Sequence, residues 1–261
     1  MYFRVFLPKL AGYSMRIYGI ADLHLAIGVP EKTMEVFGEP WIAYHEKIKN
    51  RWREVVSPQD IVLLPGDISW AMRLEQVKKD FAFIDSLPGT KYMIRGNHDY
   101  WSSASAAKIN QVLPSSLHYL SQGMCVIHPK LAVVGVRLWD SSSIYIAPQC
   151  FQDTGNPHYH EVGESDEKIF LREQGRLRRA LDSVPKNIEQ IIVMTHYPPI
   201  SSDGSLGSVA HMLEADKRIS HCIFGHMHKV RVPLEGFGYI RGIQYSLVAA
   251  DYLDFVPQRI L

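Results

Sequence analysis

The sequence lacks the features that mark several specialised classes of protein. Its three cysteines are an odd number without Cys-x-x-Cys spacing, which suits reduced cytosolic thiols better than a disulfide framework. No apolar run reaches the length of about 18 residues that a membrane-spanning helix needs. The 28 basic and 27 acidic side chains leave a net charge of +1, so nothing indicates a surface for nucleic acid or for an anionic membrane. We therefore expect a cytoplasmic protein without a membrane span, and nucleic acid is disfavoured as a partner.

The composition and the length suit a globular protein with one large core. Hydrophobic residues make up 46% of the 261 positions, and charged residues make up 21%. An α/β or sandwich fold of this size is often a single domain, which we expect over residues 15–261. The apolar stretch at the start is interrupted at Pro8 and is too short for a signal peptide, whereas a strand-like run begins at Met15. Residues 1–14 are therefore interpreted as a possible N-terminal extension.

Short apolar runs rich in β-branched residues alternate with helical patterns. The helical patterns cover residues 41–55 and 74–84, where large apolar side chains recur at helical spacing. Alternation of strand and helix predicts βαβ units around a largely parallel sheet. The predicted strands are Met15–Ala21, Ile61–Leu64, Lys91–Ile94, Ile191–Met194 and His221–Phe224.

A second kind of segment begins near Gly123. Met124–His128 and Leu131–Val136 are strand-like runs joined by a Pro-Lys turn, as in a hairpin, and Val230–Val248 is also strand-like. Residues 139–164 fit neither pattern and are predicted to form a long irregular insertion, a kind of loop that is often functional or mobile. We expect an α/β fold in which two β-sheets pack as a sandwich flanked by helices, in four layers.

Polar side chains follow each predicted strand of the βαβ region. Because loops that leave adjacent parallel strands converge at one sheet edge, we expect these side chains to meet. Taken singly, an Asp-x-His or a histidine after a strand is more often structural than a ligand. The ordered set predicts a metal site, since its residue types are those that a hard-to-borderline divalent metal prefers. The loops carry Asp22 and His24, then Asp67, then Asn97, His98 and Asp99, then His196, and finally His226 and His228.

These blocks resemble the pattern of the calcineurin-like metallophosphoesterase family, D-x-H, G-D, G-N-H-D/E, H and G-H-x-H. All five blocks occur in that order between Asp22 and His228. The resemblance implies a metal-dependent phosphoesterase that hydrolyses a phosphate ester or anhydride at a dinuclear centre. This centre would lie at the sheet edge. By resemblance, one metal is bound by Asp22, His24 and His228, the other by Asn97, His196 and His226, and Asp67 bridges them.

The chemistry of the donors agrees with that assignment. Two dications about 3.5–4 Å apart repel each other, and a shared carboxylate such as that of Asp67 offsets part of the repulsion. Imidazoles and the Asn97 amide add no negative charge, so the centre stays positive for a phosphoryl group, which a metal-bridging hydroxide can attack. Mixed O and N donors fit Mn, Fe or Zn better than Mg. His98 is the expected general acid for the leaving oxygen, with Asp99 orienting it.

Departures from better-known branches narrow the substrate class. The stretch 66–72 lacks the Asp and Arg that follow G-D in Ser/Thr protein phosphatases of this superfamily, and His98 stands where some lipid-precursor pyrophosphatases have Arg. The block 195–199 (Thr-His-Tyr-Pro-Pro) looks like that of cyclic-nucleotide and other small-phosphodiester enzymes. We therefore expect a small phosphorylated substrate and consider phosphodiesterase activity.

Several side chains are candidate substrate contacts with a structural alternative. Tyr100 and Trp101 could stack on a base or sugar, or Trp101 could start a helix and pack in the core. His158 and His160 could touch a phosphate, or simply be exposed. The arginines between 172 and 179 are interpreted first as a solvated helix face and second as an anion patch.

Two other functions remain open. A nuclease of the same superfamily would need a basic groove and a steep salt dependence of binding. A non-catalytic scaffold that keeps the fold would usually have lost ligands or the acid, yet every expected position is present. The sequence leaves the native substrate, the metal identity and the oligomeric state open.

Overall fold

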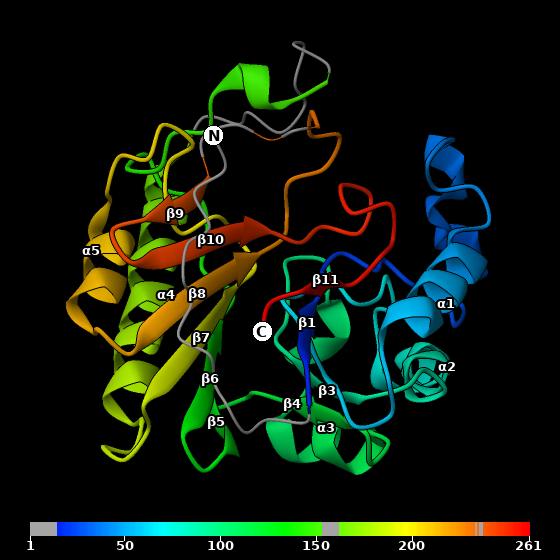
Figure 1. Ribbon diagram of the computed structural model, residues 1–261. Coiled ribbons are helices and arrows are strands. Elements are labelled where there is room, and N and C mark those ends of the chain that lie inside the picture. The colour runs from blue at the N-terminus through cyan, green and yellow to red at the C-terminus, as the bar shows by residue number, and fades with distance from the viewer. Residues whose placement is uncertain (1–14, 153–161, 233, 235–236) are drawn as a thin grey trace.

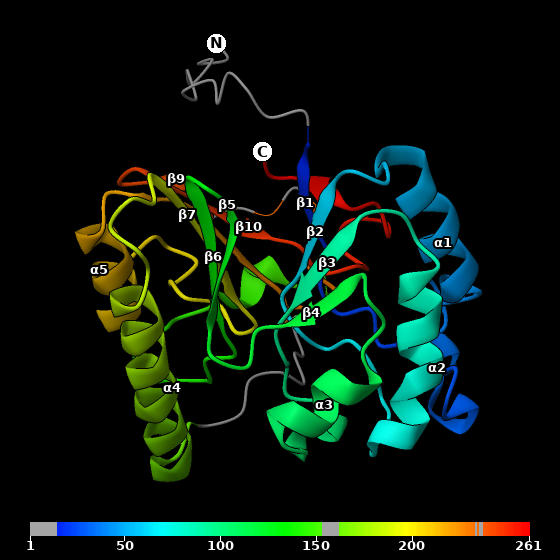
Figure 2. The same cartoon turned by 90° about the horizontal axis from the view of Figure 1, so that it is seen from below.

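Two mixed β-sheets pack face to face, and helices cover their outer faces (Figure 1). The computed structural model describes residues 15–152, 162–232, 234 and 237–261. The view from below separates the layers: α4 and α5 cover one sheet, and α1 and α2 cover the other (Figure 2). The predicted four-layer sandwich is confirmed. The possible extension 1–14 and the candidate contacts His158 and His160 lie outside the described residues.

The first sheet contains the strands of the N-terminal half. Its strands β1 to β4 are parallel neighbours in chain order, and β11 pairs antiparallel with β1. The predicted strands and helices of this half are confirmed, with bounds that differ by a few residues. In spatial order the strands are β11 (Gln258–Arg259), β1 (Ile17–Gly19), β2 (Ile61–Leu64), β3 (Thr90–Met93) and β4 (Leu117–Tyr119). The helices are α1 (Tyr44–Val55), α2 (Leu74–Asp85) and α3 (Ala106–Val112).

The second sheet has a parallel centre and antiparallel edges. Strands β6, β7, β8 and β10 are parallel to one another, while β5 and β9 pair antiparallel at the two edges. The predicted hairpin is confirmed as the β5–β6 pair. The strands in order are β5 (Met124–His128), β6 (Leu131–Val136), β7 (Gln190–Thr195), β8 (Ile219–Phe224), β10 (Ile243–Leu247) and β9 (Gly238–Ile240). The helices are α4 (Glu164–Asp182) and α5 (Ser208–Ala215).

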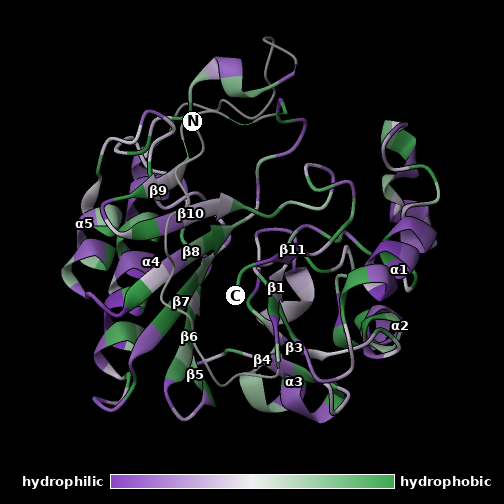
Figure 3. Ribbon diagram, viewed as in Figure 1, coloured by the Kyte–Doolittle hydropathy of each residue, from purple (hydrophilic) through white to green (hydrophobic). Residues whose placement is uncertain are grey.

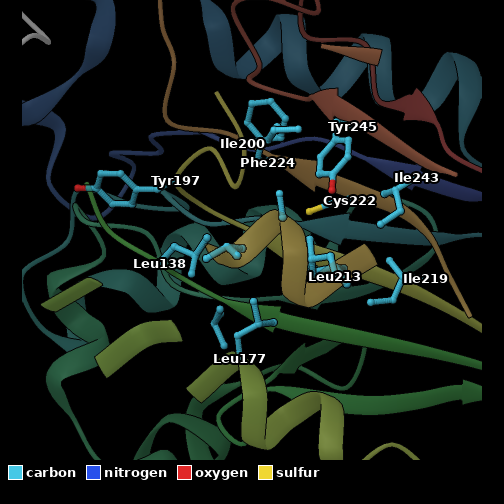
Figure 4. Packing of buried hydrophobic residues seen from close by; sticks show 14 of the residues in the cluster. Leu138, Leu177, Tyr197, Ile200, Leu213, Ile219, Cys222, Phe224, Ile243 and Tyr245 are labelled. Atoms are coloured by element: carbon cyan, nitrogen blue, oxygen red, sulfur yellow. The ribbon is translucent and has the colours of Figure 1, made fainter. Parts of the chain in front are cut away.

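Alternation along the strands divides the apolar side chains among three core layers. In β2, Val62 and Leu64 pack with the helices, whereas Ile61 and Leu63 pack between the sheets, because successive side chains of a strand point to opposite faces. In the second sheet, Leu177 of α4 and Leu213 of α5 pack beside the strands (Figure 4). The helices carry hydrophilic residues alongside these apolar ones, as expected of amphipathic elements (Figure 3). The sheets are therefore fixed against each other and against their helices.

The described part of the segment between β6 and α4 contains little regular structure. A short 3-10 helix covers Pro148–Cys150, and Phe151 forms an isolated bridge with Val230. In the described residues of the strand-like stretch 230–248, the strands are β9 and β10. None of the helices in the described ranges is long and apolar enough to cross a membrane.

Candidate metal centre

The predicted ligands lie in the loops that follow β1, β2 and β3 of the first sheet and β7 and β8 of the second. Backbone hydrogen bonds join these loops: Asp22 N donates to Gly66 O at 3.0 Å, and His226 N donates to the Asp22 carboxylate at 3.0 Å. The second of these contacts joins the two sheets. The predicted convergence at one sheet edge is therefore observed.

The first group of donors consists of Asp22, His24 and His228. The His24 Nε2 and His228 Nε2 atoms are 3.1 Å apart, and Asp22 Oδ1 lies 3.9 Å from the former and 3.6 Å from the latter. Ligand atoms of these three residues lie within 4.8 Å of one another, so the group could hold a metal ion. Asp22 and His24 are buried, so the donors are shielded from water.

The second group surrounds the amide oxygen of Asn97. Asn97 Oδ1 lies 2.7 Å from His196 Nε2 and 3.1 Å from His226 Nδ1. Asp67 stands between the two groups, because its Oδ2 atom is 3.3 Å from His196 Nε2 and 3.7 Å from His24 Nε2. Asp22, Asp67 and His196 also form a set that could hold a metal ion.

The outer hydrogen bonds of two histidines also fit metal ligation. A metal-binding imidazole usually donates its other ring N–H to a carboxylate or a carbonyl, which fixes the orientation of the ring. His228 Nδ1 lies 2.9 Å from Asp251 Oδ1, and His196 Nδ1 lies 3.0 Å from the carbonyl of Pro65. His24 departs from this pattern, since its buried Nδ1 has no hydrogen-bond partner in the part of the chain that the structure describes. The mixed carboxylate, amide and imidazole set suits Mn, Fe or Zn.

Without metal, protons compensate the charge of the buried carboxylates. Burial acts to lower the pKa of His196, but Asp67 raises it to about 9. Burial acts in the same way on His228, and Asp251 raises the pKa of His228 to about 9. Burial alone raises the pKa of a carboxyl such as Asp67, yet His196 holds the pKa of Asp67 below its usual range. A positive charge is therefore favoured on the His196 and His228 rings, whereas burial lowers the pKa of His24 to about 3.

The backbone at the site adopts a rare conformation. Asp22, His24, Asp67 and His226 have φ angles of 58°, 46°, 52° and 71°, in the left-handed region that costs roughly 1–3 kcal/mol for a residue with a side chain. These residues lie in the loops that follow β1, β2 and β8. Position 225 also requires glycine, because its backbone lies close to Asp22 and a Cβ atom there would overlap the Asp22 carboxylate.

His98 lies beside the donors, but Asp99 does not orient it as expected. The His98 backbone N donates to Asp67 Oδ1 at 2.8 Å, and burial lowers the pKa of the His98 ring. The Asp99 carboxylate instead accepts from the backbone N–H groups of residues 68, 69 and 96 and from the Trp101 indole. Within the described residues no hydrogen bond joins Asp99 to the His98 ring. The expected pairing was wrong, because this carboxylate fixes the loop backbone.

The aromatic candidates differ in exposure. Trp101 is 1% exposed, packs in the core beside Phe81 and belongs to a 3-10 helix, Tyr100–Ser103. The substrate-stacking interpretation of Trp101 is therefore wrong, and its structural alternative is observed. Tyr100 is 44% exposed, and its ring centroid is 6.2 Å from that of His98, so it remains a candidate contact.

Three neighbours of the ligands were not predicted. Asp251 hydrogen-bonds to His228 and follows β10, so it occupies one more loop at the same edge. Trp70 stacks on the His24 ring with ring centroids 5.0 Å apart and packs against the His98 ring with centroids 4.3 Å apart. The Tyr197 and His226 ring centroids are 3.9 Å apart. The signal for Asp251 was its position directly after an apolar run, 247–250.

A two-sheet sandwich with Asp, His and Asn donors at one edge defines an α/β protein with a candidate metal site. The sequence profile of the calcineurin-like phosphoesterase family matches residues 15–230, and the chain belongs to that family.

One solved structure supports the fold, and two others are also similar to the chain. A phosphopantetheinyl hydrolase from Mycobacterium tuberculosis is 11% identical, with a TM-score of 0.55, and the alignment covers 94% of this chain and 95% of that chain. A protein of unknown function from Aquifex aeolicus is 15% identical, with a TM-score of 0.48 over 94% and 95% of the two chains. GAP50, the anchor in the inner membrane complex of Plasmodium, is 15% identical, with a TM-score of 0.44 over 91% and 72%. No curated protein sequence matches the chain.

Proposed function

We propose that the protein is a phosphohydrolase that uses two divalent metal ions to cleave a phosphate ester or anhydride of a small substrate. The observation that carries the proposal is the position of Asp67 Oδ2, 3.7 Å from His24 Nε2 and 3.3 Å from His196 Nε2. One carboxylate oxygen thereby serves two donor groups, as a bridging ligand must. Family membership over residues 15–230 supports the reaction class.

Each group of donors would hold one ion. Asp22, His24 and His228 form the first set, and Asn97 with His196 and His226 forms the second. When bound, a pair of such ions supplies Lewis-acid activation of water and of the phosphoryl group. The chain contributes fixed positions for its donors, because backbone hydrogen bonds join the loops that carry them.

His98 would donate the proton that the leaving oxygen requires. Its ring is half-buried beside the donors, and Trp70 packs on it with ring centroids 4.3 Å apart, which fixes its orientation. Burial lowers the pKa of the free His98 ring. The negative charge of a phosphoryl group beside the ring favours its protonated form, so substrate binding would prepare the acid.

Paired substitutions separate proton transfer from metal binding. His98→Ala is expected to lower kcat by about 10²–10⁴, the usual contribution of a general acid, while metal content stays near two ions per chain. Asp67→Ala is expected to lose metal and activity together. Metal content is measured by elemental analysis, and activity is measured on p-nitrophenyl phosphate, bis-p-nitrophenyl phosphate and a panel of nucleotides.

His211→Ala is the matched control, since this exposed histidine lies on α5, outside the donor groups. Loss of metal in His98→Ala would make His98 a ligand instead of the acid. A fully metallated and active Asp67→Ala protein would refute the bridging role. Inactivity of the metal-loaded protein on every substrate would favour the scaffold alternative.

A further inference from the structure

A cavity lined by arginines lies beside the metal centre. Its volume is about 430 Å³, and its lining includes Arg95 after β3, Arg137 after β6, and Arg176 and Arg179 of α4. The elements that surround it, α3, α4, β4 and β6, can be followed in Figure 2. None of the seven predicted metal ligands belongs to the described lining. This cavity is therefore a separate feature of the same sheet edge.

Positive charge exceeds negative charge in this cavity. Glu173, which is 1% exposed, is the one acidic side chain among the described lining residues. Its Oε1 atom lies 2.5 Å from Arg176 Nη1, 3.4 Å from Arg95 Nη2 and 3.8 Å from Arg137 Nη2. A single carboxylate can neutralise only one of these guanidinium groups, so the cavity keeps an excess of positive charge.

Arg137 has hydrogen-bond donors to spare. Its side chain is 13% exposed, and its guanidinium carbon lies 4.3 Å from the centroid of the Trp139 ring, which holds the group flat. Among the described residues, its Nε atom is buried without a hydrogen-bond partner. Its guanidinium group lies 3.8 Å from Glu173 and also interacts electrostatically with Tyr197. A guanidinium group has five N–H donors that match the oxygens of a phosphate or carboxylate.

The cavity is linked to the metal centre through the backbone. Arg95 precedes Asn97 by two residues, so their Cα atoms lie within about 7 Å of each other. The carbonyl oxygen of Arg137 accepts hydrogen bonds from the backbone N–H groups of His196 at 3.1 Å and Tyr197 at 3.0 Å. Two of the arginines are therefore held next to loops that carry predicted metal ligands.

We propose that this arginine cavity binds a phosphate group. The group has two possible sources: a second phosphate of the substrate whose reacting phosphate lies at the metal centre, or free inorganic phosphate. The first source rests on the proposed function, whereas the second does not. Bidentate hydrogen bonds from Arg137 and its neighbours would provide the recognition.

Binding of inorganic phosphate to the metal-free protein tests the cavity without any catalysis. Isothermal titration calorimetry is expected to show that Arg137→Gln weakens phosphate binding by about tenfold or more, since a charge-assisted hydrogen bond is lost. Arg178→Gln is the control, because Arg178 is an exposed arginine of α4 that lies outside the cavity lining.

Glu173→Gln is expected to change phosphate affinity in the opposite direction to Arg137→Gln. It removes the one carboxylate from the lining while keeping the size of the side chain, so phosphate should bind more tightly than to the unchanged protein. A purely structural ion-pair cluster would lose stability in both variants and change phosphate affinity in neither. Thermal unfolding of both variants identifies loss of folding. Phosphate affinity that is equal in Arg137→Gln, Glu173→Gln and the unchanged protein would overturn the proposal.

Kinetics with the metal-loaded protein identify the source of the phosphate. The matched substrates are adenosine 5′-monophosphate and adenosine 3′,5′-bisphosphate. A KM that rises in Arg137→Gln for the bisphosphate alone assigns the cavity to the substrate. Unchanged KM values for both, together with weakened phosphate binding, assign it to free phosphate. If neither compound nor any other phosphate ester is hydrolysed, the proposed function fails, while the calorimetry still decides the cavity.

Discussion

The two sheets contribute different chemical groups to the candidate metal centre. The loops of the first sheet supply the carboxylates of Asp22 and Asp67 and the amide of Asn97, with His24 as their one imidazole. The loops of the second sheet supply three imidazoles, those of His196, His226 and His228. Each donor group draws on both sheets, so neither sheet can form the proposed centre alone. Packing of the sheets and metal binding should therefore depend on each other.

The interior between the sheets contrasts with their edge. Side chains such as Leu63, Ile192 and Ile223 fill it, and it is apolar. Such a layer fixes distance and register without any directional bonds, whereas the donors at the edge need positions accurate to a fraction of an ångström. The apolar layer fixes the two sheets relative to each other, and the hydrogen bonds between the loops fix the positions of the donors.

The largest effect is expected where the sheets approach most closely at the edge. Gly225 follows β8 of the second sheet, and a Cβ atom there would overlap the Asp22 carboxylate of the first sheet. Gly225→Ala should therefore displace Asp22, lose metal from the first group and reduce activity to background. Gly175→Ala is the matched control, because a Cβ atom on that helical glycine makes only ordinary contact with Arg179. Normal metal content in Gly225→Ala would show that the two sheets can separate at this point without harm to the centre.

Removal of the metal should lower thermal stability, because the ions bind only when the sheets are packed. At a free metal concentration of about 100 times Kd, binding stabilises a folded protein by about 2.7 kcal/mol. For a protein of this size that corresponds to a fall in Tm of roughly 5–10 °C on chelation, measured by scanning fluorimetry with and without EDTA. Asp67→Ala should show no such response. An equal Tm with and without EDTA, at confirmed metal loading, would separate metal binding from sheet packing.

The sequence was sufficient for most of the fold and for the convergence of the predicted ligands, because the strand runs and the helical patterns alternate as in βαβ units. Strand runs such as Ile61–Leu64 are short and apolar, and a polar residue follows within a few positions, as Asp67 does after Pro65 and Gly66. Parallel strands then place all such residues at the same edge. Contacts between residues far apart in sequence could therefore be predicted from the local pattern of each strand and the loop that follows it.

The wrong and missed predictions concern contacts that adjacency in sequence does not determine. Asp99 follows His98 directly, yet its carboxylate points to backbone N–H groups of the loop after β2. Asp251 belongs to no motif, and its partner His228 lies 23 residues away. The contacts of Arg137 and Arg176 with Glu173 were not predicted, whereas the arginines between 172 and 179 are exposed, as the interpretation of a solvated helix face expected. Side-chain direction within a loop depends on the folded neighbours, which a single sequence does not reveal.

The smallest effect on metal binding is expected at Asp251, which is hydrogen-bonded to the predicted ligand His228 and is not itself a predicted ligand. Its carboxylate lies 2.9 Å from His228 Nδ1 and also accepts from the backbone N–H of Lys229 at 3.0 Å. Asp251→Asn keeps an acceptor but removes the charge. Loss of such a supporting partner typically lowers metal affinity by 10–100-fold, here for the group that contains His228. Asp254→Asn, at an exposed carboxylate that pairs with Arg51, is the control.

The loss of metal affinity in Asp251→Asn should depend on pH, which makes the prediction more specific. Burial acts to lower the pKa of His228, but Asp251 raises it to about 9, so in the metal-free protein a proton occupies this ring at neutral pH. Metal must displace that proton, and affinity should therefore rise with pH up to about 9. In Asp251→Asn the pKa of His228 falls, so proton competition weakens and the rise becomes shallower. Competition with a chromophoric chelator at pH 6.5 and 8.5 should then show a larger loss of affinity at the higher pH; an equal loss at both values would mean that Asp251 only positions the ring.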